Sequence, residues 1–404
     1  MSLLLALILL AAPAPIAIGA ALPLTGPEAR SGSRQRDGLQ LAIELANAQG
    51  GVEVGGQRVP LELRVLDDAS DAATDVRQVE ELVAGGAKLL AGTFNSALVE
   101  AGSAAAERLR VPYVAPSGAS RGLYQRGFKY LFGLQAPVEQ MANTTLRWVE
   151  EQQLKKKLPS PIRVAVLAEK TPHGKEYAEA VRGFAGKTPR RREAVKLVLD
   201  EAFPLGVTDP AALLARVRDA HPDVLLIDAH LPDYLTLHAQ SLKAGICTAV
   251  ISYGARGPEP EARQKLKDGA DYVVSAVWWN AQMHRSALVQ EFVSRFEARY
   301  HHEPEWYEAL GYEAGRALVQ AIHIAGSSNP EAVRLALSRM RVDSILPGGW
   351  LAFPENYGYQ AQYFFVLQQN LPGGTAPIIY PAIAATADGV APNPRCARAA
   401  APVR

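Results

Sequence analysis

Residues 89–120, with the sequence LLAGTFNSALVEAGSAAAERLRVPYVAPSGAS, contain two short apolar runs separated by a longer segment rich in alanine. Leu89–Ala91 and Val111–Ala115 have the length and composition of buried strands, and Ser96–Leu109 has those of a helix. Neighbouring parallel strands need a crossover connection of this kind. The stretch therefore predicts a strand–helix–strand unit of a parallel sheet.

The same alternation of strands and helices continues on both sides of this stretch. Ile16–Leu22 is an uninterrupted apolar run typical of a buried strand, and apolar residues recur at helical spacing within Leu39–Ala46. A second series of alternating strands and helices begins after Pro137. Repeated alternation favours an α/β fold, with parallel sheets covered by helices on both faces.

The composition is that of a folded globular protein rather than a disordered or fibrous one. The chain has 404 residues, of which 48% are apolar and 21% charged. At about 100–200 residues per domain, this length suggests two or three domains. The 42 Lys and Arg residues against 41 Asp and Glu residues give a net charge of +1, so we expect no nucleic-acid partner.

The first residues predict a signal peptide over 1–14. Leu3–Ala12 is apolar and precedes Pro13 and Pro15, although no Lys or Arg comes before it. Ten residues are too few to cross a hydrocarbon core that needs about 20, but they suit the apolar region of an export signal cleaved near Ala12–Ala14. The alternative, a buried first strand, is disfavoured by the two prolines. No later segment reaches membrane-spanning length, so we expect an exported protein that does not span the membrane.

The sequence contains no motif that names a reaction. It lacks the Gly-rich dinucleotide fingerprint, the P-loop, the zinc-protease motif and the nucleophile elbow. Cys247 and Cys396 are too few for a zinc cluster and argue against a disulfide framework. The group at 301–303 (His-His-Glu) is more typical of a polar helix end than of a metal site. We therefore expect no catalytic residue, metal or cofactor, while an α/β enzyme with an unrecognised site remains an alternative.

Small polar residues follow two neighbouring strands of the predicted sheet. Gly92–Ser96 leaves one strand and opens a helix, and Pro116–Ser120 follows the next strand. In open α/β sheets, ligands lie beyond the carboxyl ends of the strands, where a helix N-terminus favours an anionic group. These segments suit a carboxylate held by neutral donors. The alternative is that Asn95 or Ser96 only caps the helix and the second segment is only a turn.

Several segments, in order along the chain, resemble the type I periplasmic solute-binding proteins that serve ABC importers. More narrowly, they are similar to the branched-chain amino acid (leucine/isoleucine/valine) binding family. The resemblance covers residues 16–385 and rests on order and spacing more than on any single motif. The matching segments are Ile18–Ala20, Leu22–Pro27, Asp37–Ala42, Asn47–Gly51, Asp67–Asp68, Ala115–Ser120, Gly311–Ala314 and Phe365–Gln369.

The resemblance implies two doubly wound parallel-sheet lobes joined by three hinge crossings. The expected N-terminal lobe combines 16–134 with 279–342, and the expected C-terminal lobe combines 135–278 with 343–385. The crossings are expected near Phe132–Pro137, Val274–Trp279 and Val342–Leu351. Residues 386–404, rich in Ala, Pro and Arg, are expected to form a loose tail.

The resemblance also implies nine ligand-binding positions divided between the lobes. The first lobe would hold a ligand carboxylate, and the second would close over the rest of the ligand. The implied residues are Ser31, Asn95, Ser96, Ser117, Ala119 and Ser120 in the first lobe, and His173, His230 and Tyr253 in the second.

Departures from the family pattern bear on the ligand. Ala119 lacks the hydroxyl that relatives present there, and the acidic partner of an α-ammonium falls at or beside Gly254, with Asp228 as an alternative. A buried ammonium without an anionic partner costs several kcal/mol. We therefore predict an aromatic or branched carboxylate without the amine, with Trp278 and Trp279 near the cleft. Ser70 and Asn95 stand where some relatives have a disulfide.

Taken together, the sequence predicts a non-catalytic periplasmic receptor for a small carboxylate, either an aromatic or branched acid or an amino-acid-like one. Its expected partner is an ABC permease in the inner membrane, which would recognise the closed, ligand-bound form. A ligand sensor of the same fold, working with a separate signalling partner, is the second hypothesis.

Overall fold

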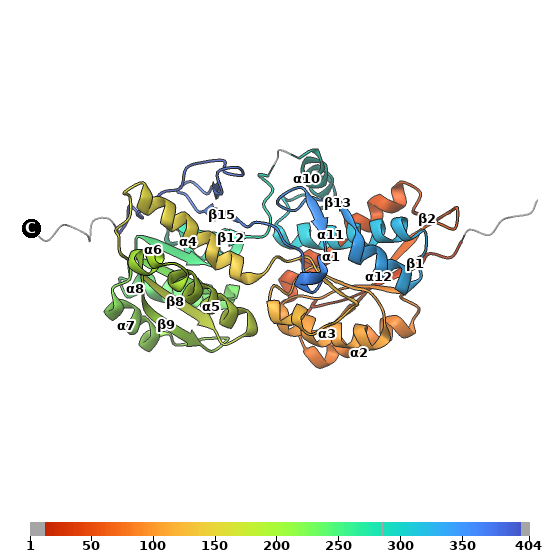
Figure 1. The fold of residues 1–404 in the computed structure, drawn as a ribbon, viewed down its shortest axis with the longest axis horizontal. Coiled ribbons are helices and arrows are strands. Elements are labelled where there is room, and N and C mark those ends of the chain that lie inside the picture. The colour runs from red at the N-terminus through yellow and green to blue at the C-terminus, as the bar shows by residue number, and fades with distance from the viewer. Residues whose placement is uncertain (1–12, 284–285, 397–404) are drawn as a thin grey trace, which may run out of the picture.

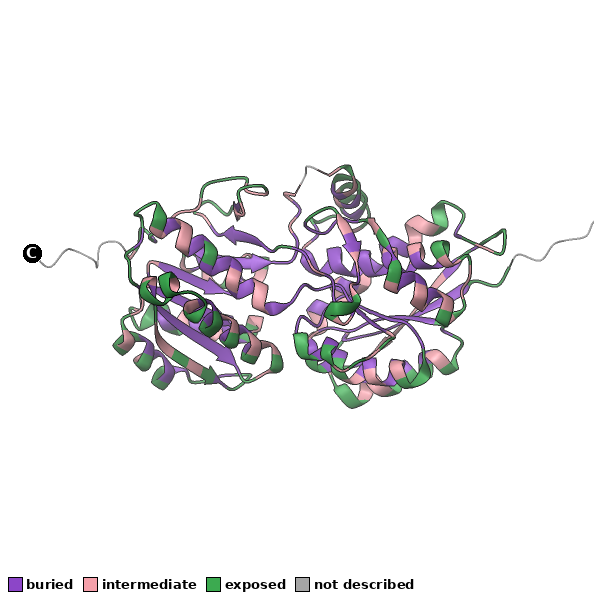
Figure 2. Cartoon of the chain, viewed as in Figure 1, coloured by how far each residue is buried: buried purple, intermediate pink, exposed green. Residues whose placement is uncertain are grey.

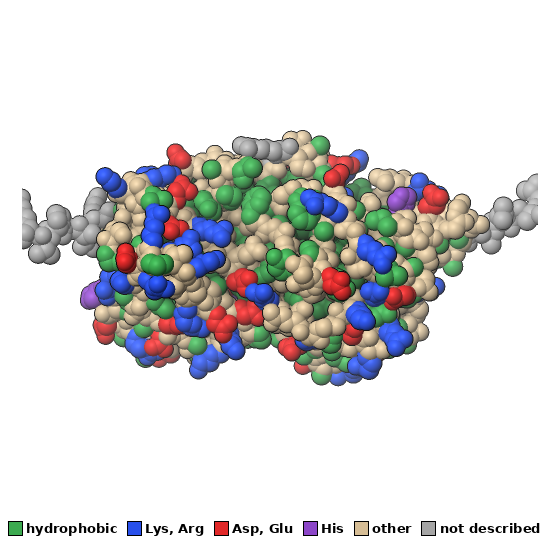
Figure 3. Space-filling view, in the orientation of Figure 1, with side chains coloured by type: hydrophobic (Ala, Val, Ile, Leu, Met, Phe, Trp, Pro, Cys, Tyr) green, Lys and Arg blue, Asp and Glu red, His purple; other side chains and the backbone are tan. Residues whose placement is uncertain are grey.

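The computed structural model describes residues 13–283 and 286–396, arranged as two α/β lobes that lie side by side (Figure 1). The expected signal peptide falls almost entirely within residues 1–12, which lie outside the described part. Lys/Arg and Asp/Glu side chains are interspersed across the face shown in Figure 3, in keeping with the net charge of +1.

The first lobe is built from both the N-terminal segment and a later segment of the chain. Its elements are β1 (Ile16–Leu22), α1 (Ala29–Ala48), β2 (Val52–Val54), β3 (Gln57–Val59), β4 (Leu61–Asp67), α2 (Ala72–Ala84), β5 (Leu89–Gly92), α3 (Ser96–Leu109), β6 (Tyr113–Ala115), η1 (Arg121–Gln125), β7 (Leu131–Gly133), α10 (Ala287–Tyr300), α11 (Trp306–Ala325), α12 (Pro330–Arg339), β13 (Arg341–Asp343), β14 (Trp350–Ala352) and η3 (Glu355–Tyr357).

The second lobe takes the middle of the chain and its last strands. Its elements are α4 (Val138–Leu154), β8 (Ile162–Glu169), α5 (Pro172–Gly186), α6 (Pro189–Ala194), β9 (Val195–Phe203), α7 (Ala211–Ala220), β10 (Val224–Asp228), α8 (Leu231–Lys243), β11 (Val250–Tyr253), α9 (Pro260–Leu266), η2 (Lys267–Ala270), β12 (Val273–Val277), β15 (Val366–Gln369) and β16 (Ile378–Tyr380).

Each lobe contains one central sheet. The first is fully parallel, in the order β4-β1-β5-β6-β7. The second has the order β16-β15-β12-β11-β10-β8-β9, and its last two strands differ from the expected parallel pairing because β15 runs antiparallel to β12 and to β16. The chain reaches β15 directly from the other lobe rather than through a helix of the same sheet, so no crossover imposes parallel pairing.

Both sheets are covered by helices on both faces, which explains their apolar strands. In β1, Ile16, Ile18, Ala20 and Leu22 pack into one hydrophobic cluster, and Ala17 and Ala21 pack into another on the opposite face. Successive side chains of a strand point to opposite faces, so a strand covered on both sides must be apolar throughout. Figure 2 shows the buried strands inside each lobe and the exposed outer surfaces of the helices.

The chain crosses between the lobes three times, and the third crossing lies later than the sequence predicted. The first two follow β7 and β12. The segment Val342–Leu351, expected to be the third, instead contributes to the hairpin β13–β14, which contacts α12 in the first lobe. The backbone of 359–361 bonds to Gly133 at the end of β7, so the crossing lies between Ala361 and Val366.

The tail expected to be loose is attached to the second lobe as far as residue 396. The Val390 N–H donates to Gln369 Oε1 at 2.7 Å, and a disulfide joins Cys396 to Cys247. The sequence argued only against a disulfide framework, and this single disulfide was not predicted from it. Their sequence separation of 149 residues gives no local motif. Residues 397–404 of the predicted tail lie outside the described part.

Within the described residues, no helix has both the length and the apolar character needed to cross a membrane.

Candidate functional site

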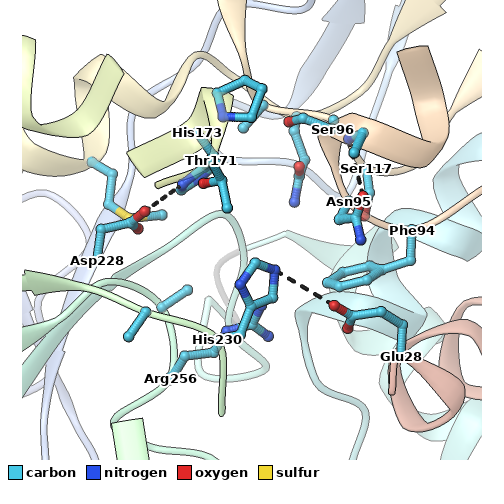
Figure 4. Close-up of a pocket in the computed structure, with 18 of the residues that line it drawn as sticks. Glu28, Phe94, Asn95, Ser96, Ser117, Thr171, His173, Asp228, His230 and Arg256 are labelled. Atoms are coloured by element: carbon cyan, nitrogen blue, oxygen red, sulfur yellow. Dashed lines mark hydrogen bonds and ion pairs between the residues drawn. The ribbon is translucent and has the colours of Figure 1, made fainter. Parts of the chain in front are cut away.

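A cavity of about 290 Å³ lies between the lobes, where the carboxyl ends of both sheets face each other. From the first lobe it is lined by the segments after β5 and β6, and from the second by those after β8, β10 and β11. Figure 4 shows Asp228 and His173 on one side of this space, and Asn95, Ser96 and Ser117 on the other. The alternation of strands and helices in each lobe thus brings polar loops from distant parts of the chain together.

The first-lobe side of the cavity presents hydroxyl groups. Asn95 is the N-cap of α3, and its Oδ1 accepts the N–H groups of Ala97 and Leu98 at 3.0 Å. Asn95 therefore caps the helix through its side-chain oxygen, as the alternative interpretation of the sequence held. The Asn95 side chain also lines the cavity. The hydroxyl of Ser96 accepts the Ser120 N–H at 3.3 Å, and that of Ser117 accepts from Gln35 Nε2 at 2.5 Å.

Both serine hydroxyls therefore still have a proton to donate. Within the described chain, neither Ser96 nor Ser117 donates a hydrogen bond from its side chain. Ser96 is also the first residue of α3, where the helix dipole favours negative charge. This side of the cavity is suited to an anionic oxygen.

On the second-lobe side, a carboxylate and an imidazole form a buried pair. Asp228 is the last residue of β10, and its Oδ2 lies 2.9 Å from Nδ1 of His173, in the first turn of α5. Burial opposes ionisation of Asp228, but the neighbouring His173, His230 and Arg256 outweigh it and lower its pKa. Asp228 is therefore an ionised carboxylate at the cavity wall.

His230 links the two lobes across the cavity. Its backbone N–H donates to Glu169 Oε1 at 2.6 Å, and its Nδ1 bonds to the other oxygen of that carboxylate. Its Nε2 lies 3.5 Å from Glu28 Oε1 in the first lobe (Figure 4). Burial lowers the pKa of His230, but the bond to Glu169 and the charges of Glu169 and Glu28 raise it above its usual value overall.

Aromatic rings form an apolar wall. Phe94, Trp278 and Trp306 all line the cavity, and the ring centroids of the two tryptophans are 4.9 Å apart. The guanidinium of Arg256 lies 5.6 Å from the Trp306 ring and is ion-paired with Glu259 at 3.1 Å. Trp278 thus borders the site, as the sequence suggested, whereas its neighbour Trp279 is a core residue.

Further contacts hold the lobes together around the cavity. Glu176 in α5 accepts from the Ser120 hydroxyl at 2.6 Å, and from the Arg121 and Gly122 N–H groups at 2.6 and 3.0 Å. These contacts close one side of the cleft. On another side, buried Glu259 accepts from Arg30 at 3.0 Å and from the Tyr307 hydroxyl at 2.8 Å. The structure is therefore in a closed arrangement.

Six of the nine predicted site residues line the cavity, and three do not. The six are Asn95, Ser96, Ser117, Ala119, His173 and His230. Ser120 is turned toward Glu176, and Ser31 borders a different hollow beside Arg30. Tyr253 is the last residue of β11 and packs in the core 4.1 Å from the ring of Tyr234. A shift of one residue along a strand exchanges the two faces of the sheet, which explains the error at Tyr253.

Several residues that line the cavity were not predicted from the sequence. Thr171 and Arg256 follow β8 and β11 at the carboxyl edge, and Phe94 lies within the polar segment after β5. Because each of the three follows a parallel strand, the sequence could have identified them as candidate site residues. Glu28 and Trp306 reach the cavity from the starts of α1 and α11, and no local pattern indicates this.

The structure also settles where the alternative acidic residue lies. Asp228 Oδ1 is 3.4 Å from the point at which a side chain on Gly254 would begin. An anionic group thus lies beside the position where the resemblance implied the acidic partner of an α-ammonium, so a missing carboxylate no longer argues against an amine. Among the described residues, no group of three or more His, Cys, Asp or Glu side chains is arranged to hold a metal ion.

Comparisons with known proteins agree with this architecture. A family model described as "periplasmic binding protein" matches residues 15–374. The Leu/Ile/Val-binding protein homolog 8 of Brucella abortus is 26% identical over 339 residues, which is 82% of each chain.

Solved structures of similar fold include proteins with different ligands. One is the branched-chain amino acid transporter substrate-binding protein LivJ from Streptococcus pneumoniae, in complex with isoleucine. Its TM-score is 0.75 at 21% identity, over 90% of this chain and 97% of that one. Another is an ABC transporter solute-binding protein from R. palustris, in complex with benzoate. Its TM-score is 0.74 at 19% identity, over 93% and 99% of the two chains.

Two α/β lobes joined by three crossings, with a small cavity closed between them, define a two-lobed solute-binding protein. The family match covers most of the chain. The chain therefore belongs to the periplasmic binding protein family, whose members bind solutes and are not enzymes.

Proposed function

We propose that this protein captures a small carboxylic acid that lacks an α-ammonium group, and delivers it to an ABC permease of the inner membrane. The observation that carries the proposal is the pair of serines, Ser96 and Ser117, which both line the cavity between the lobes and whose hydroxyls donate no hydrogen bond within the described chain. The volume of the cavity, its aromatic lining and its charged residues indicate what the ligand carries besides the carboxylate.

The carboxylate subsite is assigned to the first lobe because its donors are neutral and oriented by the fold. Gln35 fixes the Ser117 hydroxyl, and the Ser120 N–H fixes that of Ser96. Hydrogen bonds to an ionised group are about twice as strong as neutral ones. A carboxylate is therefore the acceptor that this pair of hydroxyls binds best.

The size and lining of the cavity favour a compact aromatic or branched acid. Its volume of about 290 Å³ lies just below the range of about 300–1,000 Å³ typical of small-molecule sites. Trp278, Trp306 and Phe94 offer flat apolar surfaces to such a ligand. The benzoate complex of the R. palustris protein gives this ligand class a precedent on a related fold.

The charges around the cavity argue against an ammonium group. Asp228 already faces His173, His230 and Arg256, whose influence lowers its pKa, and Glu28 is paired with His230. An incoming ammonium would share the cavity with the Arg256 guanidinium, in a region of low dielectric. The isoleucine complex of LivJ represents the competing hypothesis, an amino acid ligand.

Export and delivery complete the proposal. The apolar stretch Leu3–Ala12 supports secretion through a signal peptide, and membership of the periplasmic family agrees with it. Contacts from both lobes stabilise the closed form, which a permease distinguishes from the open form by shape. Release of the ligand would then depend on the transporter rather than on chemistry in this chain.

Calorimetric titration with five compounds tests the ligand class: benzoate, leucine, phenylalanine and the 2-oxo acids that correspond to these two amino acids. Benzoate or the 2-oxo acids should bind at least 100-fold more tightly than either amino acid. Tighter binding of leucine or phenylalanine would show that the site accepts an ammonium. Chemical conversion of a bound compound would instead identify an enzyme.

A further inference from the structure

We propose that Asp228 makes this site specific for carboxylic acids that carry a hydroxyl group at the end remote from the carboxylate. This inference rests on the proposed function and goes further, because it assigns a second polar group to the ligand. It follows from how the two oxygens of Asp228 are used.

One oxygen of Asp228 is bound and the other is not. Oδ2 bonds to His173 Nδ1 at 2.9 Å, whereas Oδ1 has no hydrogen-bond partner among the described residues. The residue is only 6% exposed and lines the cavity. An ionised, buried carboxylate thus keeps an acceptor available at the cavity wall.

An apolar ligand atom placed against this oxygen would leave it without a partner. A buried acceptor that loses its partner pays the full cost of desolvation, and the cost is larger for a charged group. Sites built to hydrogen-bond a ligand hydroxyl reject the analogue that lacks it far more strongly than apolar pockets reject a missing methylene. Asp228 should therefore discriminate against unsubstituted aromatic and aliphatic acids.

The donor that best suits Asp228 is neutral. Oδ2 of Asp228 already bonds to His173 Nδ1 at 2.9 Å, and the Arg256 guanidinium lines the same cavity. A ligand hydroxyl donates a hydrogen bond without adding a positive charge beside these two groups. An ammonium would add one, which the same surroundings oppose.

The positions of the two polar sides set the shape of the ligand. Asp228 lies on one side of the cavity in Figure 4, while Ser96 and Ser117 lie on the other. The aromatic rings of Phe94, Trp278 and Trp306 also line the space. A ligand with its carboxylate at the serines and its hydroxyl at Asp228 is a ring or short branched chain substituted at both ends.

Titration of the full chain with 4-hydroxybenzoate, 3-hydroxybenzoate, benzoate and 4-fluorobenzoate tests the inference. Fluorine is similar in size to a hydroxyl but donates no hydrogen bond. At least one hydroxybenzoate should bind at least 100-fold more tightly than both benzoate and 4-fluorobenzoate. If 4-fluorobenzoate or benzoate binds as tightly as the better hydroxybenzoate, the inference is overturned while the proposed function stands.

Asp228→Asn and Glu28→Gln form a matched pair of variants, because each replaces one carboxylate of the cavity wall by its amide. The hydroxybenzoate preference should fall at least 10-fold in Asp228→Asn and be retained in Glu28→Gln, whatever happens to overall affinity. An unchanged preference in a folded Asp228→Asn protein contradicts the assignment. If Asp228→Asn does not fold, the wild-type comparison with 4-fluorobenzoate still decides. Binding of none of these acids would refute the proposed function as well.

Discussion

Replacing Ser117 by alanine separates its role in ligand binding from its role in folding. Its hydroxyl accepts a hydrogen bond from Gln35 Nε2 and, in our account, donates one to the ligand carboxylate. The second bond involves a charged partner and contributes about 1.5–3 kcal/mol. At about 1.4 kcal/mol per factor of ten, the dissociation constant should rise about 10- to 150-fold.

The same substitution also affects the protein without ligand. It leaves Gln35 Nε2 without its partner in a residue that is 1% exposed and whose Oε1 is already unpaired. A stranded buried group costs about 1–3 kcal/mol, so the thermal midpoint should fall. Titration with the best-binding acid measures the first effect, and thermal unfolding measures the second.

Ser103→Ala is the matched control for this experiment. Ser103 is buried in α3, where its hydroxyl accepts from Arg126 Nη2 at 2.6 Å, and it does not line the cavity. The control should lower thermal stability and leave the dissociation constant unchanged. If folded Ser117→Ala protein binds the ligand within twofold of wild type, the carboxylate does not contact Ser117 and the reasoning fails.

Three further predictions concern stability and closure. Burial, followed by the charge of Asp68, raises the pKa of Asp75 from 3.8 to about 8, so the folded chain holds a proton that the unfolded chain releases. The free energy of unfolding should therefore fall as the pH rises from about 5 to 8. In urea titrations, Asp75→Asn should make this fall less steep by about 1.4 kcal/mol per pH unit. An unchanged pH dependence would contradict the assignment. Glu176→Ala removes three hydrogen bonds between the lobes. Ligand release, measured by stopped-flow fluorescence, should become about 10-fold faster or more. An unaltered release rate would show that this contact does not stabilise the closed form. The double variant Cys247→Ser/Cys396→Ser should lose about 2–5 kcal/mol of stability, provided that the wild type is oxidised, and equal stability of the two proteins would exclude the disulfide.

The sequence was informative where local pattern determines structure. The apolar run Ile16–Leu22 is strand β1, and Ser96–Leu109 is helix α3 with the same limits. The segments after β5 and β6 were identified as candidate ligand sites because parallel strands end at a common edge, a rule that needs no knowledge of distant contacts. Ser96 and Ser117 were found in this way.

The errors arose where long-range packing decides the outcome. Tyr253 was placed in the site, but its position in β11 turns the ring toward Tyr234, and a shift of one residue reverses such an assignment. The disulfide joins cysteines 149 positions apart, and no spacing rule connects them. Trp306 reaches the cavity because α11 packs against α1, which the sequence of neither helix reveals.

A crystal structure of the protein with a bound hydroxybenzoate tests the central claim most directly. Our account predicts that the ligand carboxylate lies about 2.5–3.0 Å from the hydroxyls of Ser96 and Ser117, with the ring beside Trp278 and Trp306 and both lobes closed. A carboxylate bound instead to Arg256 in the second lobe, with both serine hydroxyls turned away from the ligand, would contradict it.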